Sequence, residues 1–473
     1  MSTGPSDNIW MTRTTLRDTV VDRGVVRVPV RHAEPGGGRI ELGFVRLESR
    51  ATPAGPPVIF LAGGPGLSGV RAAQGRLYGL FDALRDRSDV VLFDQRACQP
   101  TGPSIGKTVP ALFRSDRVVT REEYLRGIAW IVREEAADLV DRGIPLDALN
   151  TSESADDVAA LARALYGTSA RVALLGWSYG SHLALAVLKR HESLIASAVL
   201  AAPEGPDHTY KRPLRIQQHL ERIAERVRAS ASPGASSFDL IATLARVLTR
   251  LERRPVTVTI RPDGLDGVLR PSRDIVIGRF DLEWIVAEGL ADARVLRRLP
   301  AWLARMDRGD FSMVGTERLL WGALDALRGE LPYTVSRYCM DCASGATAAR
   351  RDQIEREARE TLLGRTIDFP LPEICEAVGC PDLGDEFRAP PRSQVPVLFV
   401  TGTLDCRTPA ENVDELSPGL PNHHHLVVED AGHGDLLLQR RVQGTIAHFL
   451  AEGRVEIHRV HTDEAFTFES QTP

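Results

Sequence analysis

Lysine is almost absent from this chain of 473 residues. Only Lys107, Lys189 and Lys211 occur among its 58 basic residues, and the other 55 are arginines. We interpret this imbalance as a bias of genome composition, so arginine-rich stretches say little about phosphate binding. The 63 acidic residues give a net charge of −5. Such a chain lacks the positive surface that attracts nucleic acids or anionic membranes, and we expect neither as a partner.

Long apolar runs are also missing. None approaches the roughly 18 residues that span a bilayer. Residues 1–18 are polar and mixed in charge, without the basic and apolar regions of a secretion signal. We therefore expect a cytoplasmic protein. Hydrophobic residues still make up 43% of the chain, which is enough to build a core and excludes wholesale disorder.

Cysteine is sparse too, and without a secretion signal the six thiols are expected to be reduced. Cys339 and Cys342 form a CxxC pair, and Cys375 and Cys380 follow further along. Zinc needs four ligands held together, and the second spacing is wide for such a site. We therefore favour buried thiols or a labile disulfide over a metal site, and we expect no metal and no organic cofactor.

Apolar runs that end in glycine or polar residues recur between helical patterns. The runs lie at 57–62, 89–93, 171–175, 196–201 and 395–400, and helical periodicity occupies 122–142, 152–165, 181–190 and 436–450. Residues 25–30 and 40–47 alternate apolar and polar residues instead, as half-buried strands do. Strands that alternate with helices predict an α/β fold with a mostly parallel sheet.

Residues 205–390 differ in character from the rest of the chain. They contain helical patterns at 214–229, 238–252 and 354–363 and few apolar runs of strand length. Segments rich in proline flank them, at Pro203 to Pro206 and at Ala389 to Pro391. The pattern predicts one α/β core, made of residues 1–204 and 391–473, that is interrupted by a mainly helical cap over 205–390.

A GxSxG motif gives the first indication of chemistry. Gly176-Trp177-Ser178-Tyr179-Gly180 follows an apolar run and precedes a helical pattern. That context is typical of a nucleophilic serine on a tight strand-to-helix turn, with helix amides beside the reacting atom. The alternative is a glycine-rich turn in which Ser178 only caps the helix.

A serine needs a base, and the base needs an acid to orient it. Asp405 follows the run at 395–400, and His433 lies in Gly432-His433-Gly434 before the last helical pattern, in the order serine, acid, histidine. Asp430 and Asp435 are weaker candidates for the acid. Among other histidines, His182 lies on the helix after Ser178, and His423 to His425 are expected to be solvated surface.

A tetrahedral intermediate also needs amide donors for its oxyanion. The amide of Tyr179, directly after the nucleophile, can supply one. Gly63 and Gly64, in the loop Gly63-Gly64-Pro65-Gly66 after the first apolar run, can supply the other. This loop lacks the GxGxxG spacing of a nucleotide site.

Together the motifs resemble those of the prolyl iminopeptidases and the tripeptidyl-aminopeptidase-like enzymes. The resemblance rests on Gly63 to Gly66, Asp94-Gln95-Arg96, Gly176 to Ser181, Asp405 and Gly432-His433. It implies a serine aminopeptidase with the α/β-hydrolase fold, whose triad is Ser178, Asp405 and His433 and whose oxyanion hole is formed by Gly63 or Gly64 and Tyr179. It implies a peptide or another small amide or ester as the substrate.

The chain departs from the iminopeptidase pattern in three places. Ala62 stands where histidine is common, Cys98-Gln99-Pro100 interrupts the stretch after Arg96, and the elbow reads GWSYGS rather than GGSWGS. These departures leave the triad intact and remove the basis for expecting specificity for proline.

An aminopeptidase must also hold the substrate's ammonium group. Glu204 follows the run at 196–201 and should reach the rim of the site, with Asp207 and Glu283 as alternatives. The competing role for Glu204 is a salt bridge that holds the cap. Asp94 and Arg96 are expected to brace loops. Two other functions use the same fold: a carboxylic-ester hydrolase, and a catalytically silent binding module.

Overall fold

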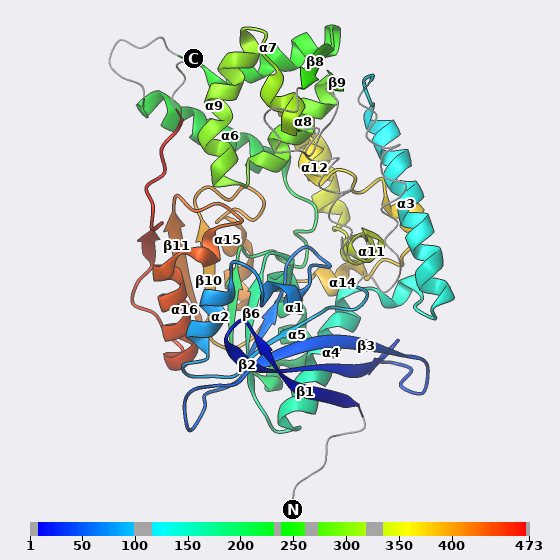
Figure 1. Ribbon diagram of the computed structural model, residues 1–473, viewed down its shortest axis with the longest axis vertical. Coiled ribbons are helices and arrows are strands. Elements are labelled where there is room, and N and C mark those ends of the chain that lie inside the picture. The colour runs from blue at the N-terminus through cyan, green and yellow to red at the C-terminus, as the bar shows by residue number, and fades with distance from the viewer. Residues whose placement is uncertain (1–7, 99–115, 231–237, 261–272, 318–333, 470–473) are drawn as a thin grey trace, which may run out of the picture.

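One large mixed sheet organises the chain (Figure 1). The computed structural model describes residues 8–98, 116–230, 238–260, 273–317 and 334–469, so Lys107 and Gln99-Pro100 lie outside it. The order of the sheet is β1-β2-β3-β5-β4-β6-β7-β10-β11-β12. Its strands are β1 (Ile9–Leu16), β2 (Thr19–Pro29), β3 (Arg39–Leu47), β4 (Val58–Leu61), β5 (Val90–Phe93), β6 (Val172–Trp177), β7 (Ile195–Ala201), β10 (Val397–Gly402), β11 (His423–Glu429) and β12 (Arg459–His461).

The sheet is antiparallel at one edge and parallel elsewhere. β1, β2, β3 and β5 pair antiparallel, and all pairs from β5 to β12 are parallel. Every residue of β4, β5 and β10 is buried, as expected for parallel strands that are covered on both faces. The predicted α/β fold with a mostly parallel sheet is confirmed.

Helices cover both faces of the sheet. Side chains of α4, α5 and α15 pack into the core on one face, and α1, α2 and α16 cover the other. A fully buried Leu, Ile, Val or Phe contributes about 1.5–3 kcal/mol, so these two layers hold the core together. The helices are α1 (Gly69–Ala72), α2 (Tyr78–Leu84), α4 (Thr151–Tyr166), α5 (Tyr179–His191), α15 (Asn412–Leu416) and α16 (Arg440–Glu452).

The described part of the 205–390 segment is mainly helical and lies above the sheet in Figure 1. It adds a two-stranded antiparallel sheet that sequence analysis missed. Its elements are α6 (Pro213–Ser230), α7 (Leu240–Arg253), β8 (Val256–Ile260), β9 (Arg273–Ile277), α8 (Arg279–Gly289), α9 (Ala293–Asp307), α11 (Thr334–Ser344), α12 (Ala348–Ala358), α13 (Cys375–Val378) and α14 (Gly384–Arg388).

Two segments from outside 205–390 pack against this helical region. Helix α3 (Arg121–Asp141) shares a hydrophobic cluster with α11, through Val132 and Val335 among others. Phe466, near the C-terminal end of the described chain, packs into the cluster formed by α6 to α9. The division at 205 and 390 stays a prediction, and the packing shows that segments on both sides of it contribute to the helical layer.

Capping side chains determine where two of the predicted helices begin, so the helix ends differ from those that the hydrophobic periodicity predicted. The pattern at 152–165 belongs to α4, which begins at Thr151 after Asn150, whose side chain accepts from the Glu153 amide and caps the helix. The pattern at 354–363 belongs to α12, which starts after its Thr347 cap and ends at Ala358. These helices exist where predicted, with shifted boundaries.

The expectation of six reduced thiols is wrong for two of them. Cys342 and Cys375 form a disulfide, with their Cα atoms 5.4 Å apart, that joins α11 to α13. The disulfide joins one cysteine of the Cys339/Cys342 pair to one cysteine of the Cys375/Cys380 pair, because α11 packs directly against α13. Disulfides are typical of oxidising compartments, so the cysteines do not support a cytoplasmic location, which stays a prediction.

The disulfide also takes two of the four cysteines considered as zinc ligands, Cys342 and Cys375, and leaves only Cys339 and Cys380 of that set as thiols. Cys98, Cys339, Cys380 and Cys406 are free in the structure. In the described part of the chain, no helix is both long and apolar enough to cross a bilayer.

Candidate active site

Ser178 stands on a sharp turn between β6 and α5. Its φ of 58° and ψ of −124° are a strained conformation for a residue with a side chain. The turn needs glycine on both sides, because a Cβ on Gly176 would lie 2.3 Å from the Gly180 carbonyl oxygen. A Cβ on Gly180 would lie 1.9 Å from that of Leu61. The GxSxG spacing is therefore what allows this turn to pack against β4.

The structure brings Ser178, His433 and Asp405 together. The Ser178 hydroxyl lies 2.9 Å from His433 Nε2, and His433 Nδ1 lies 2.8 Å from Asp405 Oδ2. Asp405 follows β10 and His433 follows β11, so both side chains leave the same edge of the parallel sheet as Ser178. The main chain fixes the histidine loop, since the His433 amide donates to the Ala291 carbonyl at 2.9 Å.

Asp405 is buried and fully hydrogen-bonded. Its Oδ1 accepts from the amides of Arg407 and Thr408 at 2.9 and 3.1 Å, and the Thr408 hydroxyl donates to Oδ2 at 2.7 Å. Burial alone would raise the pKa of Asp405, but His433 and these donors outweigh it and lower the pKa. The carboxylate therefore stays ionised and can orient the imidazole.

The two expected sources of oxyanion donors flank Ser178. Tyr179 is the first residue of α5, and amides in the first turn of a helix have no acceptor within that helix. Gly63 lies against the serine, with its ideal Cβ position 3.2 Å from Ser178 Cβ, and Gly64 follows at φ +116°. Gly63, Gly64 and Ser178 all line one pocket.

That pocket has a volume of about 280 Å³ and lies between the sheet edge and the helical layer. The core contributes Ser178, His433, Trp177 and the glycine loop. The remaining wall comes from the segment 204–211, α8, α11, the segment 367–371 and Arg407. Several charged side chains line it, namely Glu204, Lys211, Glu288, Arg337, Asp341, Asp368 and Arg407.

Glu204 lies in the pocket, as the sequence predicted, but it is paired. Lys211 Nζ donates to Glu204 Oε2 at 2.7 Å and to the His208 carbonyl at 2.8 Å. Burial alone would raise the pKa of Glu204, but the Lys211 ammonium outweighs it and lowers the pKa. Glu204 is thus ionised and shared between the pocket and Lys211, one of only three lysines in the chain.

Sequence analysis missed two further acids in this pocket. Burial raises the pKa of both Asp341 and Asp368 to about 7. Asp341, on α11, lies 3.8 Å from Arg337 Nε, and Asp368 accepts the Lys211 amide at 2.9 Å. No motif marks either residue. Asp341 shares its face of α11 with Arg337 and Ser344, as an aspartate on a solvated face would, so the sequence carries no signal for its burial.

The alternative anchors lie elsewhere. Asp207 accepts from the amide and hydroxyl of Thr347 at 2.7 and 2.8 Å, and Glu283 pairs with Arg279 at 2.7 Å. Neither of the two acids lines the pocket.

Asp94 and Arg96 brace loops, as expected. Asp94 accepts from the Ser68 hydroxyl and from the Val70 amide. The buried Arg96 holds Asp157 with two 2.7 Å contacts and reaches the Ala148 carbonyl.

The alternative acids have other partners. Asp430 pairs with Arg226 at 2.6 Å, and Asp435 accepts the Gly432 amide at 2.7 Å. Of the three candidate acids, Asp405 is the one whose side chain contacts the His433 ring.

The remaining histidines are held away from the serine. His182 contacts the Gly205 carbonyl and the Ser344 hydroxyl. His423 to His425 are half-buried in β11, and His425 bonds Thr401 at 2.8 Å, so the expectation of a solvated surface is wrong for this run.

A family comparison agrees with this architecture. The profile of the alpha/beta hydrolase fold matches residues 56–439, which is most of the chain. The chain belongs to the α/β-hydrolase fold family. With Ser178 on its elbow, it is a serine hydrolase of that fold.

The curated relatives include "Serine protease Hip1" from Mycobacterium tuberculosis and from Mycobacterium bovis. Each is 29% identical over 191 residues, which is 39% of this chain and 36% of the relative. The alignment thus spans little more than a third of the length of these relatives. The predicted resemblance to serine peptidases of this fold is confirmed at the level of the family and this relative.

Solved structures with a related fold include a proline iminopeptidase from Mycobacterium smegmatis. It is 14% identical, covers 91% of this chain and 98% of its own, and has a TM-score of 0.40. A thermophilic esterase from Thermogutta terrifontis is 16% identical, covers 91% and 99%, and has a TM-score of 0.38.

Proposed function

We propose that the protein is a serine aminopeptidase that releases residues from the free N-terminus of short peptides. The observation that carries this proposal is the pocket in front of Ser178, which holds the carboxyl groups of Glu204, Asp341 and Asp368. A site that cleaves neutral esters has no use for several buried carboxyl groups, whereas a substrate ammonium group needs them. The name of the relative, a serine protease, supports the same class of reaction.

The proposed reaction begins with proton transfer from Ser178. His433 Nε2 takes the hydroxyl proton while Oγ bonds to the carbonyl carbon of the substrate, and Asp405 stabilises the imidazolium. The oxyanion accepts hydrogen bonds from the amides of Tyr179 and of Gly63 or Gly64. As the carbon–nitrogen bond breaks, His433 gives the proton to the leaving amine. A water then attacks the acyl-enzyme, His433 takes its proton, and Ser178 recovers that proton as the acid product leaves.

The charges in the pocket favour an ammonium group over a neutral one. Lys211 compensates Glu204 directly, and Glu288 pairs with Arg407. Asp341 is only loosely paired, with Arg337 at 3.8 Å, and no hydrogen bond to its carboxyl group comes from the described residues. We therefore propose Asp341 as the main anchor of the substrate ammonium group, with Glu204 beside it.

The test compares substrates that differ only at the N-terminus. Aminoacyl-naphthylamides with a free amine should be hydrolysed, and their N-acetylated counterparts should be poor substrates. p-Nitrophenyl esters provide the second comparison. Cleavage of esters without any cleavage of free-amine amides would contradict the peptidase proposal and favour the carboxylic-ester hydrolase.

A fluorophosphonate probe separates the enzyme from the silent binding module. Covalent labelling should occur at Ser178 and disappear in Ser178→Ala. If wild-type protein that is folded by circular dichroism does not label, the catalytic proposal fails altogether.

A further inference from the structure

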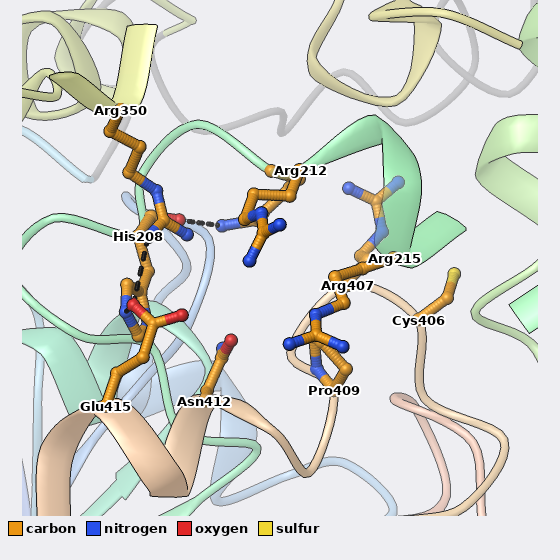
Figure 2. A pocket seen from close by; sticks show the side chains of 10 residues that line it. His208, Arg212, Arg215, Arg350, Cys406, Arg407, Pro409, Asn412 and Glu415 are labelled. Carbon is orange, nitrogen blue, oxygen red and sulfur yellow. Dashed lines mark hydrogen bonds and ion pairs between the residues drawn. The ribbon is translucent and has the colours of Figure 1, made fainter. Parts of the chain in front are cut away.

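A second, much smaller cavity is lined in part by Cys406, Arg407 and Pro409, which follow Asp405 in the same loop. Its volume is about 10 Å³, which is the space of one water-sized group. Five cationic side chains line it, with Glu415 as the single carboxylate among the lining residues: Lys211, Arg212, Arg215, Arg350 and Arg407. Figure 2 shows Arg212, Arg350 and Arg407 reaching toward the same space from different elements.

The cations are held in place from outside the cavity. Glu357 pairs with Arg212, Glu288 with Arg407 and Glu204 with Lys211, and none of these carboxylates lines the cavity. Within the cavity, Glu415 accepts from Arg350 at 3.1 Å and contacts His208 at 2.8 Å. The cluster is therefore fixed before any ligand arrives, which reduces the entropy lost on binding.

Hydrogen bonds to the described residues leave many of the guanidinium donors unused. A guanidinium carries five N–H groups. The Arg407 side chain uses only Nη2, and Arg215 uses only Nη1, toward Gln218. Arg212 uses Nε and Nη2 for the single oxygen Glu357 Oε1.

Arg215 is the least compensated cation of the cluster. Its nearest carboxylate is Glu411 at 3.7 Å, and Arg222 shares this carboxylate at 3.6 Å. The cavity also adjoins the first turn of α6, where the helix dipole adds positive potential.

We propose that this cavity is a binding site for one small inorganic anion of halide size. The unused guanidinium donors and the weakly compensated Arg215 create a site for negative charge, and the volume limits that charge to a single small ion. The anion would also hold Arg407, whose backbone amide donates to Asp405 Oδ1 at 2.9 Å and whose side chain lines the active-site pocket. Anion binding is thereby connected to the loop that positions the acid beside His433.

The first experiment measures thermal unfolding in sodium chloride and in sodium gluconate at equal ionic strength. A ligand that binds the folded state raises the melting temperature with its concentration. We expect a saturable, chloride-specific rise for the wild type. A shift that is the same in both salts reports screening alone and would overturn the proposal.

A matched pair of variants locates the effect. Arg215→Gln removes a cation that lines the cavity, and Arg222→Gln removes one on the same helix that shares Glu411 but does not line it. Arg215→Gln should weaken the apparent chloride affinity by about tenfold or more, because hydrogen bonds to charged groups are strong. Arg222→Gln should keep the wild-type response. Equal responses of the two variants would contradict the assignment.

Crystals soaked in sodium bromide give a readout that does not depend on activity. Anomalous scattering should place a bromide within hydrogen-bond reach of Arg215 and Arg407. Bromide found only elsewhere on the protein would refute the site and leave the proposed peptidase function untouched.

Discussion

Ser178, the proposed nucleophile, has a strained backbone conformation. Its conformation costs about 1–3 kcal/mol, which the packed turn around Gly176 and Gly180 has to offset. We predict that Ser178→Ala lowers kcat for a free-amine naphthylamide by at least about 10³-fold, as removal of a triad member does. Steady-state kinetics check this, with unchanged circular dichroism as the control for folding. A variant that turns over at the wild-type rate would refute the mechanism.

With Asp341 as the proposed anchor of the substrate ammonium group, we predict that substrate binding depends on pH. Burial raises its pKa from the ordinary value of 3.8 to about 7, so the carboxyl group is neutral in acid and charged above about pH 7. The KM for free-amine substrates should rise as the pH falls below about 7. Asp341→Asn should raise KM by about tenfold or more at pH 8, leave kcat close to wild type, and remove this pH dependence. Glu283→Gln, which removes a carboxylate outside the pocket, should change neither constant.

The same residue has an opposite effect on stability. Between pH 3.8 and about 7 the folded state binds a proton on Asp341 that the unfolded state has released. Stability therefore falls as the pH rises through this window, because the folded state binds more protons there. Asp341→Asn should melt at a higher temperature than the wild type at pH 8 and at a similar temperature at pH 4. A lower melting temperature for the variant at pH 8 would contradict the raised pKa.

At the scale of helices and strands, sequence patterns predicted the elements whose position depends on local interactions. The buried strands at 57–62 and 171–175, the elbow and α5 were found because apolar runs and glycines mark them directly. β1 was missed, since six of its eight residues are exposed and carry no apolar pattern. Asp341 and Asp368 were missed because only tertiary packing brings α11 and the segment 367–371 over Ser178.

The disulfide between α11 and α13 should make a measurable contribution to the stability of the fold. The disulfide closes a loop of 33 residues, and restricting the unfolded chain in this way contributes about 4 kcal/mol in the entropic estimate. Cys375→Ser should therefore lower the melting temperature, and dithiothreitol should have little further effect on it. Cys380→Ser removes a nearby free thiol and should keep the sensitivity to dithiothreitol. Equal melting temperatures for both variants and the wild type would show that the link carries no stability.

At the scale of the whole molecule, the sheet edge supplies the reacting groups and the helical layer supplies most of the pocket wall. Ser178, Asp405 and His433 come from the carboxyl ends of β6, β10 and β11, and motifs in the sequence mark all three. Arg337, Tyr338, Asp341 and the segment 367–371 come from the layer that no motif describes. The candidate triad and Glu204 could therefore be predicted from the sequence, whereas the pocket residues on α11 and at 367–371 could not.

The space between the sheet edge and the helical layer should limit the size of the substrate. The pocket of about 280 Å³ is slightly smaller than the range of roughly 300–1,000 Å³ that is usual for small-molecule sites. From this volume we expect room for about one or two N-terminal residues and none for a folded chain. Mass spectrometry of digests should show removal of residues from the N-termini of short peptides and no internal cleavage of a folded protein such as serum albumin. Internal cleavage that disappears in Ser178→Ala would contradict this prediction, because it requires an extended chain to pass through the pocket in both directions.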